Sequence, residues 1–226
     1  MANAREEILG RIREALKVTA PKPHFKSESL GATHSINAKP WLPDGGETES
    51  ARLELLSENL AKLKANLIRV PNADAANQAL AQISQTKNWK KVAYHSHPLV
   101  SPAAEALPCE KWEVGASLDK QKLEGCDAGV TSCEALVSQL GSILVSSESS
   151  GGRSLSILPH VHVVIATTDQ VVADLETCFK QVLEKHRSKL PSMLSFITGP
   201  SRTGDIERIL VLGAHGPKEL YVILIG

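Results

Sequence analysis

Short apolar segments alternate with helical patterns beyond residue 70, and this alternation constrains the fold more than any other feature. Residues 161–166 (VHVVIA) and 220–225 (LYVILI) are almost continuously apolar, as strands buried on both faces are. Further strands are expected at 91–95, 111–114, 127–131, 142–147 and 193–198, and helices at 72–86, 102–107, 170–186 and 205–210. The pattern predicts an α/β domain with an open, largely parallel sheet and flanking helices.

Two segments of different character come before this pattern. Residues 3–17 predict a short helix, because Asn3 and Glu6 have the spacing of a capping box. Residues 19–47 contain four prolines and show no sustained period, which predicts an extended arm. The arm lies on its own domain or embraces a partner subunit, and the sequence leaves both open. The predicted division is an N-terminal helix and arm, 1–47, and an α/β domain, 48–226.

A leucine stripe predicts a second helix over residues 48–67. The stripe has steps of three and four and consists of Leu53, Leu56, Leu60, Leu63 and Leu67. Two heptads are short for a coiled coil. We therefore expect a helix docked on the core, with helix pairing in a homo-oligomer as the alternative.

Charge and apolar content exclude several classes of protein. The 226 residues hold 25 basic and 25 acidic side chains, and only 4% are aromatic. A nucleic-acid binder needs a basic surplus and rings for stacking, so no nucleic-acid partner is expected. The sequence has no apolar run long enough to span a bilayer and no apolar signal-peptide core at the N-terminus. A cytoplasmic protein without a membrane partner is expected.

The four cysteines give no metal-binding pattern. They are Cys109, Cys126, Cys133 and Cys178, and no Cys-x-x-Cys occurs. Zinc-ribbon and ferredoxin-type sites use such closely spaced pairs. We expect reduced thiols, no metal site and no cofactor in this chain.

Residues 199–217 carry the densest group of ligand-binding residue types. An expected strand-to-helix turn holds Gly199, Ser201, Arg202, Thr203, Gly204 and Asp205. Free N–H groups at a helix start bind anions, and Arg202 can hold a carboxylate or phosphate through two parallel hydrogen bonds. In open α/β sheets, ligands bind at the carboxyl ends of strands, where this turn is expected. The alternative is an ordinary turn with Thr203 or Asp205 as the helix cap.

His215 follows this turn closely, between Gly213 and Gly216. Near neutral pH, such a histidine can act as an acid, a base or a hydrogen-bond donor. It can equally stabilise its own loop through backbone hydrogen bonds. His215 and Gly216 are therefore ligand-binding candidates, and His215 and Asp205 are catalytic candidates.

A second candidate region spans residues 134–154. Gly141 and Ser142 precede an expected strand, and a serine-rich stretch ending in Gly151, Gly152 and Arg153 follows it. This turn can cradle an anion, or it is a polar hairpin. Glu134 is a candidate nucleophile or base, or a solvated loop carboxylate.

Two His-x-His pairs, His95 with His97 and His160 with His162, have a spacing that metal sites use. Neither pair has a cysteine or carboxylate ligand nearby in sequence. Structural or surface histidines are the better interpretation of both pairs. A Gly-x-Ser-x-Gly elbow is also missing, so no hydrolase is predicted.

The C-terminal sequence FITGPSRTGDIERILVLGAHGPKELYVILIG closely resembles the signature of the lactate utilisation protein C family, the LUD domain. The segments CEALVSQLGSILVSS and GGRSLSILPHVHVVIA resemble the middle of that family. The resemblance covers residues 66–226. One departure is Gln139-Leu140-Gly141-Ser142, where family members often have Glu-Thr-Gly-Thr or Glu-Thr-Gly-Ser.

The resemblance implies a fold of the sugar-isomerase and CoA-transferase-like (NagB/RpiA-like) group. It also implies a three-component cytoplasmic system that oxidises L-lactate to pyruvate, with iron–sulfur clusters in the two partner components. It supplies no catalytic residue to carry over. The sequence therefore predicts a non-redox component that binds a small anion. The alternative is a free-standing CoA-transferase-like or cyclo-ligase-like enzyme that binds a phosphorylated ligand.

Overall fold

The structure is a computed structural model that describes residues 4–17, 43–115, 119–203, 211–213 and 215–226. The chain forms two compact units, Met1–Leu42 and Pro43–Gly226. The described part of the first unit is helix α1 (Ala4–Lys17), which agrees with the predicted helix. Its Ile8 and Ile12 side chains are exposed. Most of the predicted arm and the predicted helix at 205–210 lie outside the described residues.

The second unit is built on a six-stranded sheet in which every neighbouring pair is parallel. Its order is β1-β12-β7-β4-β2-β3. The strands are β1 (Asn66–Val70), β2 (Lys91–Tyr94), β3 (Glu110–Glu113), β4 (Ala128–Thr131), β7 (Val161–Thr167) and β12 (Glu219–Ile225). The predicted α/β class with a parallel sheet is therefore confirmed, while the likeness to the NagB/RpiA-like group stays a prediction.

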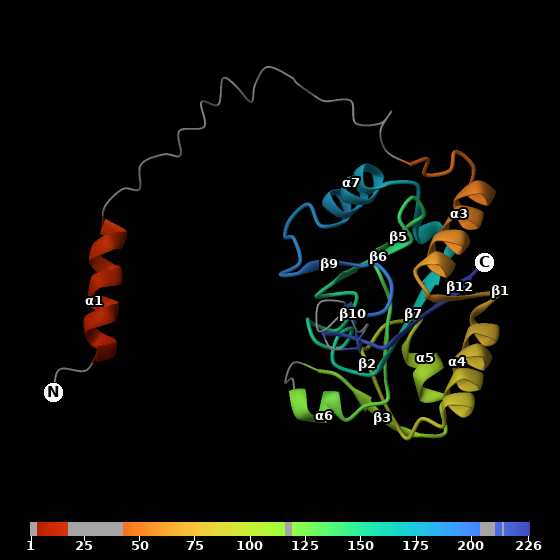
Figure 1. The fold of residues 1–226 in the computed structure, drawn as a ribbon, viewed down its shortest axis with the longest axis horizontal. Helices are drawn as coiled ribbons and strands as arrows, with labels where there is room; N and C mark the ends of the chain where they lie inside the picture. Colours follow the sequence, from red (N-terminus) through yellow and green to blue (C-terminus); the bar gives the residue numbers. More distant parts are fainter. Residues whose placement is uncertain (1–3, 18–42, 116–118, 204–210, 214) are drawn as a thin grey trace, which may run out of the picture. The chain divides into compact units, whose positions relative to one another are not determined.

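Alternating side chains of the central strands face two different layers. On one face, Val163 and Ile165 pack with α4 (Ala73–Lys87) and α5 (Ser101–Glu105). On the other face, Val164 and Ala166 pack with α3 (Glu49–Lys62) and a second sheet. Figure 1 shows α3 and α4 alongside β1 and β12.

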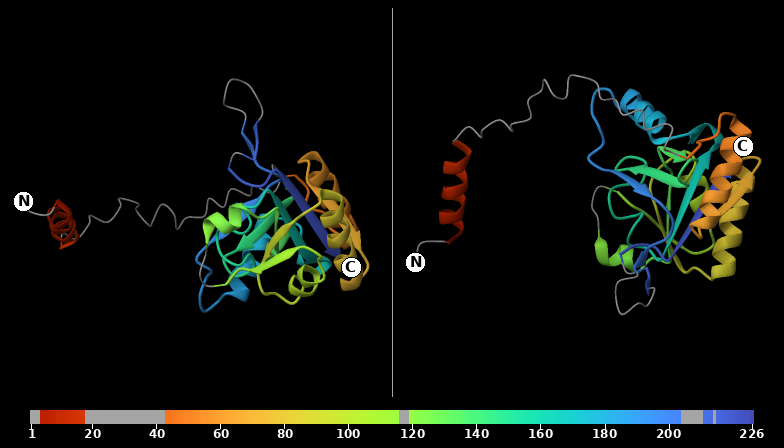
Figure 2. Two further views of the ribbon diagram at one scale, coloured as in Figure 1. Left: turned by 90° about the horizontal axis from the view of Figure 1, so that it is seen from below. Right: turned by 45° about the horizontal axis from the view of Figure 1, so that its top comes forward.

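The second sheet has the order β8-β5-β6-β9. Its strands are β8 (Val171–Val172), β5 (Ala135–Val137), β6 (Ser142–Ser146) and β9 (Leu194–Ile197). Helix α7 (Leu175–Lys185) packs Cys178 and Val182 against its outer side, far from α4 in all views (Figure 2). Short helix α6 (Lys120–Glu124) places Leu123 against the loop that contains Leu155.

Two helix predictions were wrong at one end. The helix expected over 48–67 ends at Lys62, and Leu67 lies in β1. The helix expected over 170–186 begins only at Leu175. There Asp174 caps the first turn, and Val171–Val172 pair with β5 as a strand. In both cases the spacing of leucines or valines is helical beyond the end of the helix. Pairing with neighbouring strands makes those residues part of a strand instead.

No helix among the described residues is long and apolar enough to cross a membrane. All four cysteines are free thiols; Cys109 is half-buried and the other three are buried.

Candidate functional site

The parallel sheet has one point at which the direction of chain progression reverses. From β2 the chain continues to β3 at one edge, and from β4 it continues to β7 on the other side. Parallel sheets bind ligands outside the carboxyl ends of the two strands that flank such a point. Here those ends lead into His95 after β2 and Glu134 after β4.

His95 is buried at this position, with 4% of its surface exposed. Neither of its ring nitrogens has a hydrogen-bond partner among the described residues. Burial lowers the pKa of His95 to about 4, and the nearby His97 ring adds to this effect, whereas a backbone contact with Val130 opposes it. The two rings lie 5.6 Å apart between centroids. His95 is therefore a neutral, unpartnered imidazole next to a second one.

Glu134 is an ionised carboxylate within the same region. Lys185 Nζ donates to its Oε2 at 2.6 Å and Ser146 Oγ donates to its Oε1 at 2.6 Å. Burial raises the pKa of Glu134, but the hydrogen bonds from Lys185 and Ser146 outweigh burial and hold the pKa below its ordinary value. His186 Nε2 lies 3.5 Å from the same carboxylate. The low pKa makes Glu134 a fixed negative charge at neutral pH and a weak base.

A serine-rich segment, residues 146–153, covers this region, and we call it the covering loop. Ser146 Oγ accepts backbone N–H bonds from Glu148 and Ser149 while it donates to Glu134. Gly151 has φ +62° and lies so close to His95 that a Cβ atom there would overlap the His95 Cβ. At the end of the loop, Arg153 Nη2 donates to the Ser192 carbonyl at 2.7 Å. The polar hairpin interpretation is therefore wrong, because this segment leads from β6 of the four-stranded sheet to β7 of the six-stranded sheet, and these two strands do not pair.

We define the switch-point cluster as His95, His97, Glu134, Lys185 and His186. Glu134 and Lys185 also act electrostatically on His97, and Glu148 lies 3.7 Å from His186 Nδ1. No three His, Cys, Asp or Glu side chains in the described part of the chain are placed to hold a metal ion. The cluster combines one internally balanced ion pair with imidazoles that can donate, accept or take up a proton.

The C-terminal candidates lie elsewhere, and their local structure differs from the predicted turn into a helix. Arg202–Thr203 form strand β10, which pairs antiparallel with β11 (Val211–Leu212). Ser201 organises the base of this ribbon: its N–H donates to Pro217, its carbonyl accepts from Gly213, and its Oγ accepts from His215 N–H. Gly204 and Asp205 lie outside the described residues. We call residues 199–203, 211–213 and 215–217 the C-terminal loops.

Arg202 is exposed, and its Nη2 donates to the Leu63 carbonyl at 2.6 Å, where α3 ends. Gly199 lies against Leu63 as well. Gly216 packs near Ser201, and the His215 side chain is exposed. The contact with Leu63 places a cation at a helix C-terminus, a stabilising arrangement, and it uses one of the five guanidinium donors.

Gly141 and Ser142 lie on the same side of the unit as Arg202. Gly141, at φ +65°, packs against Asn59 of α3, whose Nδ2 donates to the Ser138 and Gln139 carbonyls. Ser142 Oγ is 2.8 Å from Thr198 Oγ1, one residue before Gly199. This turn therefore holds α3 and β9 together.

A family model described as the LUD domain matches residues 53–225. The chain belongs to the LUD domain family. Lactate utilization protein C of Bacillus velezensis is 24% identical, with 98% of this chain and 95% of that protein covered. The same-named protein of Bacillus subtilis is 26% identical over 80% of this chain and 71% of its own length. In Oceanobacillus iheyensis the match, at 28% identity, spans 54% of either chain.

The fold is also similar to a solved structure. A crystal structure of a DUF162 family protein from Deinococcus radiodurans covers 79% of this chain and 99% of its own, with a TM-score of 0.62 and 22% identity. At this identity the likeness establishes the fold of the LUD unit.

Gln139, which departs from the usual LUD pattern, makes a structural contact. Gln139 is buried, and its Nε2 donates to the Pro43 carbonyl at 2.6 Å. Ser138 Oγ donates to the Gly45 carbonyl next to it. A glutamate carboxylate has no proton to donate at neutral pH. The glutamine therefore fastens residues 43–45 onto the turn that precedes β6.

The candidate residues of the LUD unit fall into two separate groups. Glu134 and Arg153 lie with the covering loop, while Gly199, Ser201, Arg202, His215 and Gly216 lie at the C-terminal loops. Lys185 and His186 could not be predicted from the sequence. They are 51 and 52 residues from Glu134 and occur at the end of an ordinary amphipathic helix. Within the other His-x-His pair, His160 is exposed, whereas His162 is buried with Nε2 2.8 Å from Thr131 Oγ1.

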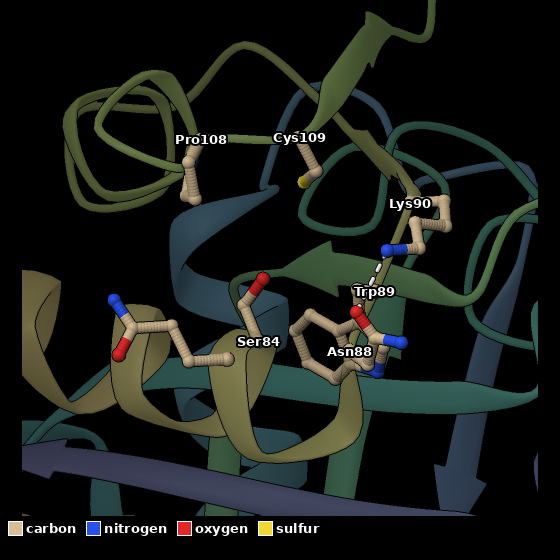
Figure 3. A pocket seen from close by; sticks show the side chains of 7 residues that line it. Ser84, Asn88, Trp89, Lys90, Pro108 and Cys109 are labelled. Atoms are coloured by element: carbon tan, nitrogen blue, oxygen red, sulfur yellow. Dashed lines mark hydrogen bonds between the residues drawn. The ribbon is translucent and has the colours of Figure 1, made fainter.

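A hollow of about 370 Å³ lies at the opposite, amino ends of β2 and β3 (Figure 3). Its lining residues are Ser84, Gln85, Asn88, Trp89, Lys90, Pro108 and Cys109. Lys90 Nζ donates to Asn88 Oδ1 across its rim. None of the predicted site residues lines it, so it is not the candidate site.

Proposed function

We propose that this chain is a non-redox component of a system that oxidises L-lactate to pyruvate. The observation that carries the proposal is the full-length similarity to lactate utilization protein C of Bacillus velezensis, within a LUD domain match over residues 53–225. Two further proteins of the system, each with iron–sulfur clusters, perform the electron transfer, and the chain acts in the cytoplasm with them.

The assignment of electron transfer to partners rests on the cysteines of this chain. Iron–sulfur clusters are held by thiolates. Burial raises the pKa of Cys126 and of Cys178 to about 11, and burial also raises the pKa of Cys133. The three thiols pack in apolar clusters, which fits side chains of the core.

The proposed anion site of the component is the C-terminal loops. Arg202 is exposed, and one of its five guanidinium donors binds the Leu63 carbonyl. Ser201 Oγ orients the backbone N–H of His215, whose side chain is exposed. A carboxylate or phosphate at this surface would meet a planar cation and an imidazole.

A genetic experiment tests the role in lactate use. A strain without the gene should fail to grow on L-lactate, grow normally on pyruvate, and recover when the chain is restored. Affinity purification of the tagged chain from lactate-grown cells, without oxygen, should recover two iron–sulfur proteins. Unchanged growth on lactate would overturn the proposal.

The alternative function is that of a free-standing enzyme, and the same purification tests it. An iron-free eluate without partners, together with stabilisation by CoA, a nucleotide or a folate, would support it. A ligand present at about a hundred times its Kd stabilises the folded state by about 2.7 kcal/mol, which a thermal-shift measurement detects.

A further inference from the structure

We propose that the switch-point cluster is a second binding site, which takes a small 2-hydroxycarboxylate on His95 and His97. The choice of ligand class rests on the proposed role in lactate oxidation. The location rests on the fold alone, because β2 and β4 flank the one reversal of chain progression in the parallel sheet.

The unpartnered His95 ring is the observation that points to a ligand. Its side chain is buried, and both nitrogens are without hydrogen-bond partners in the described part of the chain. Buried polar groups are almost always hydrogen-bonded in proteins. A ligand that offers an acceptor oxygen to this ring would supply a missing partner.

His97 adds a donor of known orientation. Its Nδ1 accepts the Leu99 N–H at 3.2 Å, so the neutral ring carries its proton on Nε2. The His97 ring is half-buried and lies 5.6 Å from His95 between centroids. The two N–H groups of one imidazole point away from each other, so one His95 N–H and the His97 Nε2–H are the donors that can face one small ligand.

A 2-hydroxycarboxylate matches these two donors. A carboxylate oxygen and the adjacent hydroxyl oxygen are two acceptors within one small group. Its negative charge balances the proton that His95 takes up from solvent on binding. The Glu134–Lys185 pair is internally neutral, so it adds no net repulsion.

The covering loop controls access to this site. Gly151 lies directly on His95, and Gly151 and Gly152 both have positive φ angles. Entry of a ligand requires this loop to move away, and the Ser146–Glu134 bond holds its first residue in place. The glycine pair is where the backbone can change direction at least cost.

Binding should be linked to pH through His95. Other titratable groups surround it: His97 on the same loop, Glu134 after β4, Glu148 on the covering loop, and Lys185 and His186 at the end of α7. Because one proton is taken up, the affinity for L-lactate should fall by about tenfold for each unit that the pH rises between the pKa of free His95, about 4, and its higher pKa in the complex.

Nuclear magnetic resonance of the full chain with ¹⁵N-labelled histidine tests the site directly. L-lactate should convert the His95 ring from the neutral to the protonated pattern, and propionate, which lacks the hydroxyl, should bind about fivefold more weakly. His95→Phe should abolish the response and His97→Gln should weaken it about tenfold. His160→Gln, at an exposed histidine outside the cluster, is the matched control and should leave it unchanged.

Three results would overturn the proposal. One is a His95 signal that responds to lactate no more than to chloride at equal ionic strength. Another is a response confined to His215, which would place the ligand at the C-terminal loops. A third is a lactate response of the remaining histidines that survives His95→Phe, or a His95 response that His97→Gln leaves at full strength. If His95→Phe fails to fold, the wild-type spectra and the variant His97→Gln, at a half-buried position, still test the proposal. Growth on lactate reports on the proposed function separately, so the two failures are distinguishable.

Discussion

The switch-point cluster and the C-terminal loops differ in how the chain assembles them. The cluster joins side chains that are far apart in sequence, such as Glu134 and Lys185, around a buried carboxylate and a buried imidazole. The C-terminal loops come from one short stretch, lie largely at the surface, and are held mainly by backbone bonds around Ser201. The family motif therefore lies at the surface, and the chemically richer environment lies where the sequence shows only a common His-x-His pair.

Acidification should change the free energy of unfolding most strongly, through buried histidines such as His95 of the switch-point cluster. Burial lowers the pKa of His95 to about 4 and that of His162 to about 3, from 6.5 in the unfolded chain. The unfolded chain therefore binds protons that the folded one excludes. The stabilisation is fully present above pH 6.5 and is lost as the pH falls towards the folded values, by roughly 3 kcal/mol for each histidine by pH 4.

Urea unfolding at a series of pH values checks this prediction. The free energy of unfolding should begin to fall before the carboxylates titrate. His95→Phe should remove about half of that slope. A flat free energy between pH 6.5 and pH 4 would contradict the buried, neutral state of these rings.

Removal of the Glu134 carboxylate should give the next largest effect. Glu134→Ala removes the acceptor of Ser146 Oγ and the partner of Lys185, and a cost of about 2 kcal/mol is expected for the buried hydroxyl left without its acceptor. Chemical denaturation measures the change. Glu148→Ala, on the same loop but largely exposed, should cost less than about 0.5 kcal/mol. Equal effects of the two variants would show that the buried charge has no special role.

Gln139→Glu asks whether the position that departs from the family pattern is a structural contact. The change places a carboxylate oxygen against the Pro43 carbonyl, where the amide now donates. Two acceptors in contact lose the hydrogen bond and repel each other, so a destabilisation of about 2 kcal/mol is expected at neutral pH. Calorimetric melting should show this loss, and Gln139→Met, without the charge, should lose less. A Gln139→Glu variant as stable as wild type would remove the structural explanation.

The central strands β7 and β12 could be predicted from the sequence because they are short and almost continuously apolar. Residues 161–166 and 220–225 became β7 and β12 within one residue at either end. The errors occurred where one periodicity ran into another. Val171 and Val172 continue the helical spacing of α7, but their pairing with β5 makes them a strand. Only the tertiary fold decides between the two periods.

The candidate site could be predicted only where its residues are contiguous. Ser201, Arg202 and His215 do lie together, because 14 residues separate Ser201 from His215 and a ribbon returns the chain to its start. The partners of Glu134 depend on how α7 packs on the small sheet. His95 appeared in the sequence as one of a common His-x-His pair, and its burial and missing partners are properties of the folded unit alone.

Arg202→Lys should have the smallest effect on stability and a clear effect on binding. Arg202 is exposed and makes one bond to the Leu63 carbonyl. A lysine ammonium can also lie at this helix C-terminus, so the free energy of unfolding should change by less than about 1 kcal/mol. Lysine cannot reproduce the planar pair of donors that a carboxylate or phosphate prefers. Affinity for inorganic phosphate, measured by calorimetry, should therefore fall about tenfold.

His215→Ala extends this test, because its exposed side chain can be removed while the N–H bond to Ser201 Oγ stays. It too should fold normally and bind phosphate more weakly. If both variants unfold, the C-terminal loops are a structural support for α3. If both bind phosphate as the wild type does, the anion site does not lie there. Either result would leave the His95 signal as the measure of ligand binding, because the switch-point cluster uses neither Arg202 nor His215.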